Sequence, residues 1–419
     1  MNSSWTALRY PVFRRLWIAS AISGTCVAAH DNAATYVLNS LSGNPALLSL
    51  IPVVIALPFF LFTLPAGMLA DRVDRKKLLC AINLWLAAGA FSLAIFNWLH
   101  ILNSYLILAC IFFIGTGFAA NSPVSTAVVA TLVPETELSS VATLNGLQFN
   151  ISGILGPALG GLLLPLIGAN QIFLINAACF LFVILAVQQW KESVRQSPAS
   201  SKLPSPGRNS VIHSVFRTPT LQRAVAQNLQ FAFFISAIPA VVPVIGLKLL
   251  NFTSSDLGLC FTFMGIGSAS AAVLILPRLK KYFPGEILTL SNVCIAVVYV
   301  LFCLIHEKSF FLLTASLAGA GWTISASELW ARGQSAIPDW ARGRLTATMI
   351  TVSQGATALG ALVWSSLVAT IGPSHTLITT ALLFSASILL SNQQPLLSLF
   401  VDRLPVLRLV RLQELKSLA

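Results

Sequence analysis

Long apolar runs alternate with short polar breaks along most of the chain. Each run is about long enough to cross a hydrocarbon layer of roughly 30 Å as a helix, whereas barrel strands would alternate polar and apolar residues. The pattern predicts an all-α integral membrane protein with twelve transmembrane helices. Their expected ranges are Phe13–Leu41, Ala46–Ala70, Leu78–Leu99, Tyr105–Val133, Val141–Ile167, Ile172–Trp190, Leu221–Leu250, Leu257–Leu276, Ile287–Ile305, Phe310–Ala331, Leu345–Ile371 and Thr376–Ser391.

The longest internal polar break divides these helices into two sets of six. It is rich in serine, proline and basic residues, and it shows no apolar periodicity before Leu221. We expect an N-terminal bundle over residues 1–190, a cytoplasmic linker over 191–220, a C-terminal bundle over 221–392 and a basic tail over 393–419. The tail fits an amphipathic helix on the anionic cytoplasmic leaflet, and it equally fits a tethered disordered segment.

The two sets of six helices show an internal repeat. A shift of the sequence by 204 residues aligns positions in the fourth and fifth spans with positions in the tenth and eleventh. Because the repeat contains an even number of spans, the halves have the same orientation, as in transporters built from two parallel bundles with a site between them. The aligned pairs are Gly115 with Gly319, Gly117 with Gly321, Pro134 with Pro338, Glu135 with Asp339, Gly156 with Gly360, and Gly168 with Gly372.

Composition and charge agree with a membrane protein. Of the 419 residues 56% are hydrophobic and 9% are charged, against roughly 25% charged in an average soluble domain. The net charge of +12 does not indicate a nucleic-acid partner, because the basic residues lie between apolar runs. With a cytoplasmic N-terminus, every Lys and Arg except Lys248 and Lys308 lies inside. This bias predicts a multi-pass protein of a bacterial inner membrane with both termini in the cytoplasm.

A cleaved signal peptide is the alternative interpretation of the first apolar run. Arg14 and Arg15 precede an apolar stretch that ends at Ala29. Cleavage there would place the basic residues 72–77 outside, which contradicts the positive-inside bias.

The sequence contains no motif for hydrolysis, nucleotide binding or metal binding. It lacks a Walker loop, an HExxH sequence and a nucleophile elbow. It therefore indicates a protein that is not an enzyme and that uses no cofactor. The cysteines form no CxxC pair, so we interpret them as packing residues without a disulfide or a metal. They are Cys26, Cys80, Cys110, Cys179, Cys260, Cys294 and Cys303.

The loop after the second run combines small, acidic and basic residues. Gly67 allows close helix approach, Asp71 can accept hydrogen bonds at a neighbouring helix N-terminus, and the cations can bind carboxylates across the bundle interface. Such contacts suit a cytoplasmic gate, although a basic turn that only fixes topology is an alternative. The candidate gate residues are Gly67, Asp71, Arg72, Asp74 and Arg75.

Over nearly its whole length the chain resembles the major facilitator superfamily, most specifically in this loop. Phe13–Trp17, the same loop and Gly343-Arg344 make it similar to the branch of drug and siderophore exporters that includes the enterobactin exporter. The resemblance implies that Asp71, Arg72 and Arg75 latch the cytoplasmic side against span eleven. The corresponding loop of the second half, residues 277–281, keeps only the cations, so its gating does not follow from the first half.

Span five carries small residues at spacings of three and four around a proline, which frees a backbone carbonyl and bends the helix. This pattern resembles the antiporter signature of the family's exporters, while plain helix packing would give a similar pattern. The residues concerned are Gly153, Gly156, Pro157, Gly160 and Gly161.

Asp31 is the single carboxylate well inside an apolar span, where an ionised side chain costs about 2.5–3.5 kcal/mol. It is the first candidate for proton coupling, with adjacent His30 as a group that titrates near neutral pH. A hydrated residue at the outer mouth is the alternative, because Asp31 lies roughly 24 Å along the helix from Arg15. Glu328 is the second candidate, although Arg332 one turn away can neutralise it.

Polar and aromatic residues inside the spans are candidates for lining a mainly apolar cavity, and some are expected to be interhelical contacts instead. They are Asn32, Tyr36, Asn121, Gln148, Asn150, Gln227, Asn228, Gln230, Phe231, Trp322 and Gln354. We predict a secondary transporter that exports an amphipathic small molecule, of the drug or siderophore class, in exchange for protons. It is expected to act as a monomer among membrane lipids. The alternatives are a facilitator or importer of a nutrient or lipid-like solute, and a non-transporting membrane scaffold or sensor.

Overall fold

The computed structural model describes residues 5–42, 44–70, 73–188, 219–283, 285–336 and 342–393, and every regular element within these ranges is a helix. The first half contains η1 (Thr6–Arg9), α1 (Pro11–Leu41), α2 (Pro45–Ser49), α3 (Ile51–Ala70), α4 (Arg75–Trp98), α5 (Ser104–Leu132), η2 (Glu135–Glu137) and α6 (Leu138–Gln188). The second half contains α8 (Pro219–Ile235), α9 (Ala237–Val244), η3 (Ile245–Leu249), α10 (Ser254–Ser270), η4 (Ala271–Ile275), α11 (Leu276–Tyr282), α12 (Ile287–Leu304), α13 (Lys308–Ala336), α14 (Arg342–Ile371) and α15 (Pro373–Gln393). The predicted tail, apart from Gln393, and all of the linker before Pro219 lie outside the described residues.

Nine helical stretches in the described part of the chain are long and apolar enough to cross a membrane. Twelve spans are expected from the sequence, and the difference has three sources. The polar residues of α1 lower its mean hydropathy, the apolar part of α15 is short at Pro373–Leu389, and α6 is a single stretch. The all-helical membrane fold is confirmed, and the number of crossings stays a prediction.

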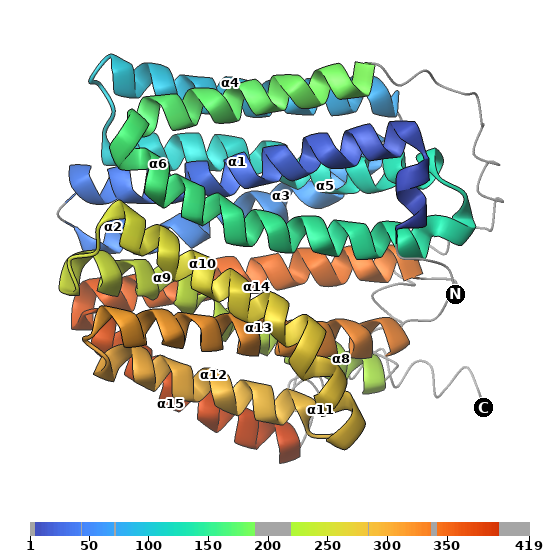
Figure 1. The fold of residues 1–419 in the computed structure, drawn as a ribbon. Helices are drawn as coiled ribbons and strands as arrows, with labels where there is room; N and C mark the ends of the chain where they lie inside the picture. Colours follow the sequence, from blue (N-terminus) through green and yellow to red (C-terminus); the bar gives the residue numbers. More distant parts are fainter. Residues whose placement is uncertain are drawn as a thin grey trace, which may run out of the picture.

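The helix α6 folds back on itself. A straight helix of its 51 residues would be about 77 Å long, far more than one crossing requires. Gly168 has φ 79° and ψ 166°, a conformation open to glycine, and the helix reverses there. Figure 1 shows a first limb, residues 138–167, and a second limb, residues 169–188, running in opposite directions.

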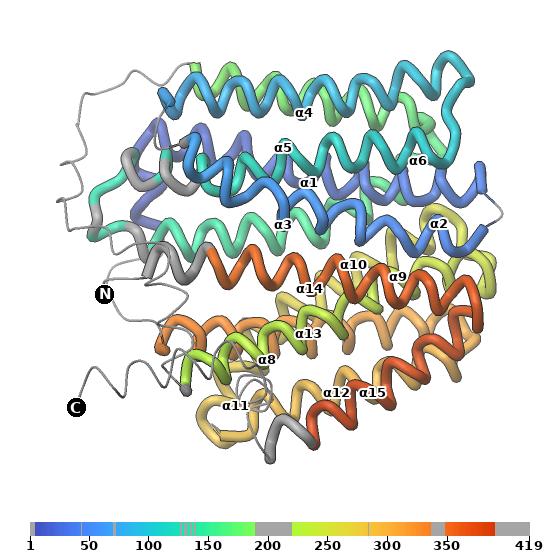
Figure 2. The backbone as a smooth tube through the Cα atoms, turned by 180° about the vertical axis from the view of Figure 1, so that it is seen from behind, coloured from blue at the N-terminus to red at the C-terminus, as the bar shows by residue number. Residues whose placement is uncertain are grey.

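The helices of each half gather together, with α1 to α6 on one side of the molecule and α8 to α15 on the other (Figures 1 and 2). The start of α1, the end of α6, the start of α8 and the end of α15 lie at one end of the bundle, which we call the terminal end. The connections from α1 to α2 and from α9 to α10 lie at the opposite end.

The repeated glycines occupy equivalent places in the two halves. Gly372 has φ 81° and separates α14 from α15, as Gly168 separates the limbs of α6. A Cβ atom on Gly156 would lie 2.4 Å from the Ala28 Cβ of α1, and one on Gly360 would lie 2.2 Å from the Phe233 carbonyl oxygen of α8. Each glycine thus packs against the first helix of its own half. The pair in the fourth and tenth predicted spans behaves likewise, with Gly117 against Leu86 of α4 and Gly321 against Ile295 of α12.

Candidate functional site

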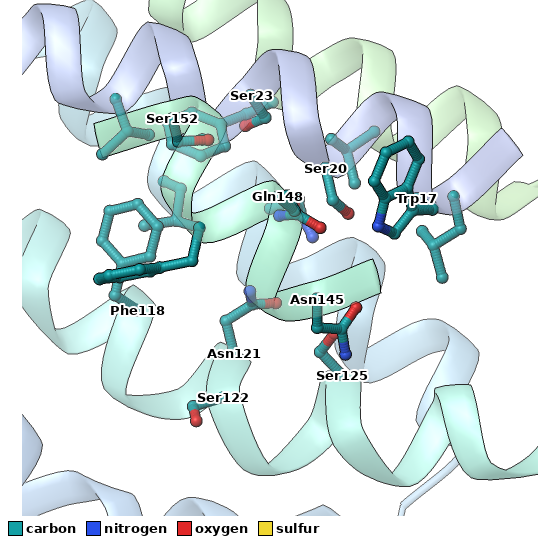
Figure 3. Close-up of a pocket in the computed structure, with 18 of the residues that line it drawn as sticks. Trp17, Ser20, Ser23, Phe118, Asn121, Ser122, Ser125, Asn145, Gln148 and Ser152 are labelled. Atoms are coloured by element: carbon teal, nitrogen blue, oxygen red, sulfur yellow. The ribbon is translucent and has the colours of Figure 1, made fainter. Parts of the chain in front are cut away.

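A cavity of about 660 Å³ lies in the first half, between α1, α4, α5 and both limbs of α6. This volume is within the range of small-molecule sites. The lining combines aromatic and aliphatic side chains with serines and amides, and none of the described residues that line it is basic. Figure 3 shows polar side chains from three helices around one space. The polar lining residues are Ser20, Ser23, Asp31, Asn83, Asn121, Ser122, Ser125, Asn145, Gln148 and Ser152.

The position of this cavity differs from the sequence expectation of a cavity between the halves. All of its lining residues belong to the first half. The reason is close packing across the boundary, where a Cβ atom on Gly258 of α10 would lie 2.4 Å from the Pro157 carbonyl oxygen of α6. Two residues that line the large cavity, Asn145 and Phe149, are exposed on the surface of the protein.

Asp31 supplies the one carboxyl group among the described residues of the cavity lining. Asp31 is exposed and lines the cavity, and its side chain has no hydrogen bond or ion pair with any described residue. Its backbone carbonyl accepts a hydrogen bond from the Thr35 hydroxyl at 2.7 Å. An acidic group without a partner, in a cavity without a base, is suited to hold a proton or a cationic group of a ligand.

His30 does not share the cavity with Asp31. Its side chain is buried, and its ring centroid lies 4.7 Å from that of Phe173 on the second limb of α6. Neither ring nitrogen has a hydrogen-bond partner among the described residues. Consecutive residues of a helix point about 100° apart, so the two neighbours face different surroundings.

Glu328 and Arg332 form the ion pair that their one-turn spacing predicts, with Arg332 Nε 2.8 Å from Glu328 Oε1. The side chain of Glu328 is 12% exposed and that of Arg332 is 35% exposed. Arg332 also lines a smaller cavity of about 90 Å³ in the second half. Glu328 and Asp31 therefore belong to different sites, one paired and one unpaired. The smaller cavity is further lined by Gln227, Gln230, Phe231, Gly285, Leu288, Thr289, Asn292 and Ile388.

The gate loop is described in part. Asp71 and Arg72 lie outside the described residues, and Arg75 is the half-buried first residue of α4. The Asp74 carboxylate accepts hydrogen bonds from the backbone N–H groups of Lys76 and Lys77, at 2.8 and 3.0 Å, and so caps α4. This capping role was not predicted, although an aspartate before an apolar run is a helix-start signal. Gly67 lies near the end of α3, where a Cβ atom on it would lie 3.9 Å from Pro123 of α5.

The glycines of span five pack on two helices. Gly156 and Gly160 face α1, where a Cβ atom on Gly160 would lie 2.6 Å from the Ala29 carbonyl oxygen. Gly161 faces α10 of the other half, where a Cβ atom on Gly161 would lie 2.7 Å from the Ser254 carbonyl oxygen, and the Gly153 carbonyl oxygen would lie 2.7 Å from a Cβ atom on Gly265. The motif therefore brings the first limb of α6 close both to α1 and to the second half.

The carbonyl of Gly161 accepts hydrogen bonds from the other half. Pro165, four residues later, has no N–H group, so this carbonyl lacks its helical donor. The hydroxyls of Ser254 and Ser255 donate to it at 3.3 and 3.1 Å. The Thr262 hydroxyl, which donates to the Gly258 carbonyl of its own helix at 2.8 Å, also lies 3.1 Å from the Ile154 carbonyl oxygen of α6. Sequence reasoning missed these contacts, whose signal is a proline in one span and two serines at the start of another.

The remaining cavity candidates are distributed over several environments. Asn121 and Gln148 line the large cavity, and Gln227, Gln230 and Phe231 line the small one. Asn32 is buried, with its Nδ2 atom 3.3 Å from the Pro157 carbonyl oxygen. Asn150 donates to the Gly146 carbonyl at 2.9 Å. The half-buried residues that line neither cavity are Tyr36, Asn228, Trp322 and Gln354.

Sequence reasoning also missed the serines of the cavity. Ser20 and Ser23 lie on the same face of α1 as Asp31, at helical spacings that a search for polar residues around Asp31 would have found. Ser122 and Ser125 of α5 follow the same three-residue spacing.

The chain folds as two packed helical halves with a cavity in the first half, and solved structures of transporters superimpose on it. A bacterial homologue of the human lysosomal transporter Spinster, inward-facing and unoccupied, gives a TM-score of 0.71 at 13% identity, over 91% of this chain and 96% of that one. A nucleoside transporter gives 0.69 at 13% identity, over 91% of this chain and 99% of that one. At these identities the likeness shows the fold alone.

The chain belongs to the major facilitator family of transmembrane secretion effectors, whose profile matches residues 2–406. The resemblance to the superfamily is thereby confirmed. A macrolide efflux protein of Streptococcus pyogenes is 30% identical over 164 residues, which cover 39% of this chain and 40% of that protein. A staphyloferrin A transporter of Staphylococcus aureus is 22% identical over 74% of this chain and 77% of that protein. The protein is therefore a multi-pass membrane protein of this family, with efflux proteins among its relatives, and it matches about 40% of the length of the macrolide efflux protein.

Proposed function

We propose that this protein exports an amphipathic small molecule, of the drug or siderophore class, from the cytoplasm of a bacterial cell in exchange for protons. It crosses the inner membrane twelve times, with both termini inside, and acts as a monomer by alternating access between its two halves. The names of the relatives, a macrolide efflux protein and a staphyloferrin A transporter, support export of this class.

The unpaired carboxyl group of Asp31 in the 660 Å³ cavity is the observation that carries this proposal. Phe13, Trp17, Phe118 and Phe180 supply apolar contact surface, while the serines and amides supply hydrogen bonds. A lining without a basic residue disfavours a multiply charged anion and favours a neutral or cationic amphipathic ligand.

Asp31 can couple substrate transport to proton movement because the proton and the substrate bind at the same carboxyl group. A carboxyl group that releases its proton on the cytoplasmic side becomes an anion that attracts the substrate, and re-protonation from outside releases the substrate there. A proton that enters down the membrane potential contributes about 2.3 kcal/mol per 100 mV. This energy supports export against a substrate gradient.

Contacts between the halves at the end opposite the terminal end support an inward-facing arrangement. Lys248 Nζ donates to the Ser42 carbonyl at 3.0 Å, and the Ser365 hydroxyl donates to the Ser49 carbonyl at 2.6 Å. If the terminal end is cytoplasmic, these bonds close the outer side. Asp71, Arg72 and Arg75 would then latch the inner side in the opposite state.

Everted membrane vesicles test the proposal directly. We expect vesicles energised by a proton gradient to accumulate a radiolabelled macrolide or tetraphenylphosphonium, and an uncoupler to abolish the accumulation. Asp31→Asn should lower proton-driven accumulation by more than about tenfold, which corresponds to 1.4 kcal/mol, while Asp31→Glu keeps part of it. Glu286→Gln is the matched control, because it removes an exposed carboxylate that precedes α12 and lies outside the cavity lining.

Three results would change the proposal in different ways. Unaltered transport and pH dependence in Asp31→Asn would reject Asp31 as the proton site. Accumulation that persists with the uncoupler would favour a facilitator. A wild-type protein that moves no compound in either direction would favour a scaffold or sensor.

A further inference from the structure

Two free cysteines meet at the contact between α1 and the second limb of α6. Cys179 Sγ donates to Cys26 Sγ at a distance of 3.2 Å. Both side chains are half-buried, and neither is in a disulfide. They lie 153 residues apart in the sequence, so only the packing of these two helices brings them together.

The pair lies at the lipid-facing edge of this contact, midway along α1. Cys26 is fifteen residues from each end of α1, which is about 22 Å of helix in either direction. Ile22 precedes Cys26 by one turn, and Ile175 and Phe182 flank Cys179 by one turn on each side. All three are exposed on the surface of the protein. Because these neighbours are large and apolar, the thiols are reached from hydrocarbon more readily than from water.

The same contact separates the thiols from the cavity by one layer of side chains. Val27, next to Cys26, and Phe180, next to Cys179, both line the cavity. Two buried polar residues lie elsewhere along the contact between α1 and the second limb of α6. They are His30 and Asn176, and neither side chain has a hydrogen bond among the described residues. A covalent bond between the cysteines would therefore join two walls of the cavity at a point where packing and one weak thiol hydrogen bond now hold them.

We propose that Cys26 and Cys179 form a redox-active dithiol that a quinone dissolved in the bilayer oxidises to a disulfide. Both S–H bonds break and one S–S bond forms, while two electrons and two protons pass to the quinone and convert it to the hydroquinone. The sulfur atoms must move from 3.2 Å to the roughly 2.05 Å of a disulfide, a change within reach of side-chain rotation. Water-soluble disulfides such as oxidised glutathione act by exchange with a thiolate, which hydrocarbon disfavours.

Oxidation would fix α1 against the second limb of α6 and so restrict the cavity beside them. This inference does not depend on the identity of the substrate or on proton coupling, because it concerns the thiols alone.

Thiol counting in reconstituted full-length protein tests the inference. The protein is placed under nitrogen in phosphatidylethanolamine and phosphatidylglycerol vesicles that contain tetramethylbenzoquinone, whose substituted ring resists addition of thiols. After denaturation, iodoacetamide alkylates the remaining thiols and mass spectrometry identifies the peptides. We expect the alkylated cysteines to fall from seven to five per chain. One hydroquinone should form per chain, and the Cys26 and Cys179 peptides should be linked.

Matched variants and a second oxidant complete the experiment. Cys26→Ser and Cys179→Ser should each keep all six remaining thiols, and buried Cys110 and Cys260 should be alkylated in every sample. Oxidised glutathione should leave Cys26 and Cys179 unlinked. The inference is overturned if both thiols stay alkylated in quinone-loaded vesicles, if either pairs with another cysteine, or if glutathione oxidises the pair as fast as quinone.

Discussion

The two halves share a helical plan and differ in their interiors. Gly168 and Gly372 turn the chain at equivalent places, yet the cavity described in the first half has a volume of about 660 Å³ and the one described in the second half about 90 Å³. Asp31 faces the larger cavity without a partner, whereas Glu328 in the second half is paired with Arg332. The comparison shows that the equivalent glycines keep the same helix arrangement in both halves. The residues between these glycines decide which half contains the large cavity with an unpaired acid.

Residues at equivalent positions of the repeat show how the second half fills its space. Ser125 lines the large cavity, and the residue 204 positions later is Leu329, which is 1% exposed. Asn121 lines the cavity, while its counterpart Ser325 is buried and donates to Asn292 at 2.9 Å. At these two positions the second half has a buried leucine and a hydrogen-bonded hydroxyl, where the first half has polar side chains that line the cavity.

The largest expected effect comes from exchanging these equivalent residues. Leu329→Ser should destabilise the protein by about 4 kcal/mol, because it leaves a cavity and buries a hydroxyl. Ser125→Leu should leave stability nearly unchanged, since the cavity has room for the side chain, and should lower binding of the transported probe by more than about tenfold. Thermal unfolding in detergent and probe binding measure the two effects. Equal destabilisation by both changes would contradict the difference between the halves.

Removal of charge should also distinguish the two acids. Arg332→Met leaves the carboxylate of Glu328 buried without a partner, at a cost of about 3 kcal/mol, the low end for a buried pair because Arg332 is 35% exposed. Asp31→Asn should not destabilise the protein, because the carboxyl group has no partner to lose. Unfolding midpoints of both variants in one detergent provide the measurement. A loss of stability in Asp31→Asn would reveal an ion pair or hydrogen bond at Asp31.

Equivalent glycines offer a test of packing in the two halves. A Cβ atom on Gly319 would lie 1.9 Å from the Met264 carbonyl oxygen, while one on Gly115 would lie 3.0 Å from the Pro58 ring. Gly319→Ala must move backbone, so we expect it to cost about 2 kcal/mol, and Gly115→Ala to cost less than about 1 kcal/mol. Unfolding midpoints that rank the variants in the opposite order would contradict the closer approach of helices in the second half.

The smallest expected effect concerns the carbonyl of Gly161. Alanine at both Ser254 and Ser255 removes its hydroxyl donors, and we expect a loss of about 1 kcal/mol. In a Pro165→Ala background a helical N–H group becomes available to this carbonyl, so the same double change should cost little. A double-mutant cycle of unfolding free energies measures this coupling. A cost that is the same in both backgrounds would show that the serines act in another way.

Local features of the structure could be predicted from the sequence. The apolar runs predict helices, the repeat predicts equivalent turns at Gly168 and Gly372, and the four-residue spacing predicts the Glu328–Arg332 pair. These features depend on helical periodicity and on residues that are close in sequence, so the chain itself specifies them.

Only the tertiary structure decided which residues form the site. Asp31 and His30 are adjacent in sequence, yet one faces the cavity and the other packs on Phe173. Cys26 meets Cys179, and Gly161 meets two serines of the other half, across long separations in sequence. Periodicity gives the faces of each helix, but the partner of each face depends on how distant helices pack. The sequence therefore determined the helices and their repeat, and the packing between helices determined the cavity.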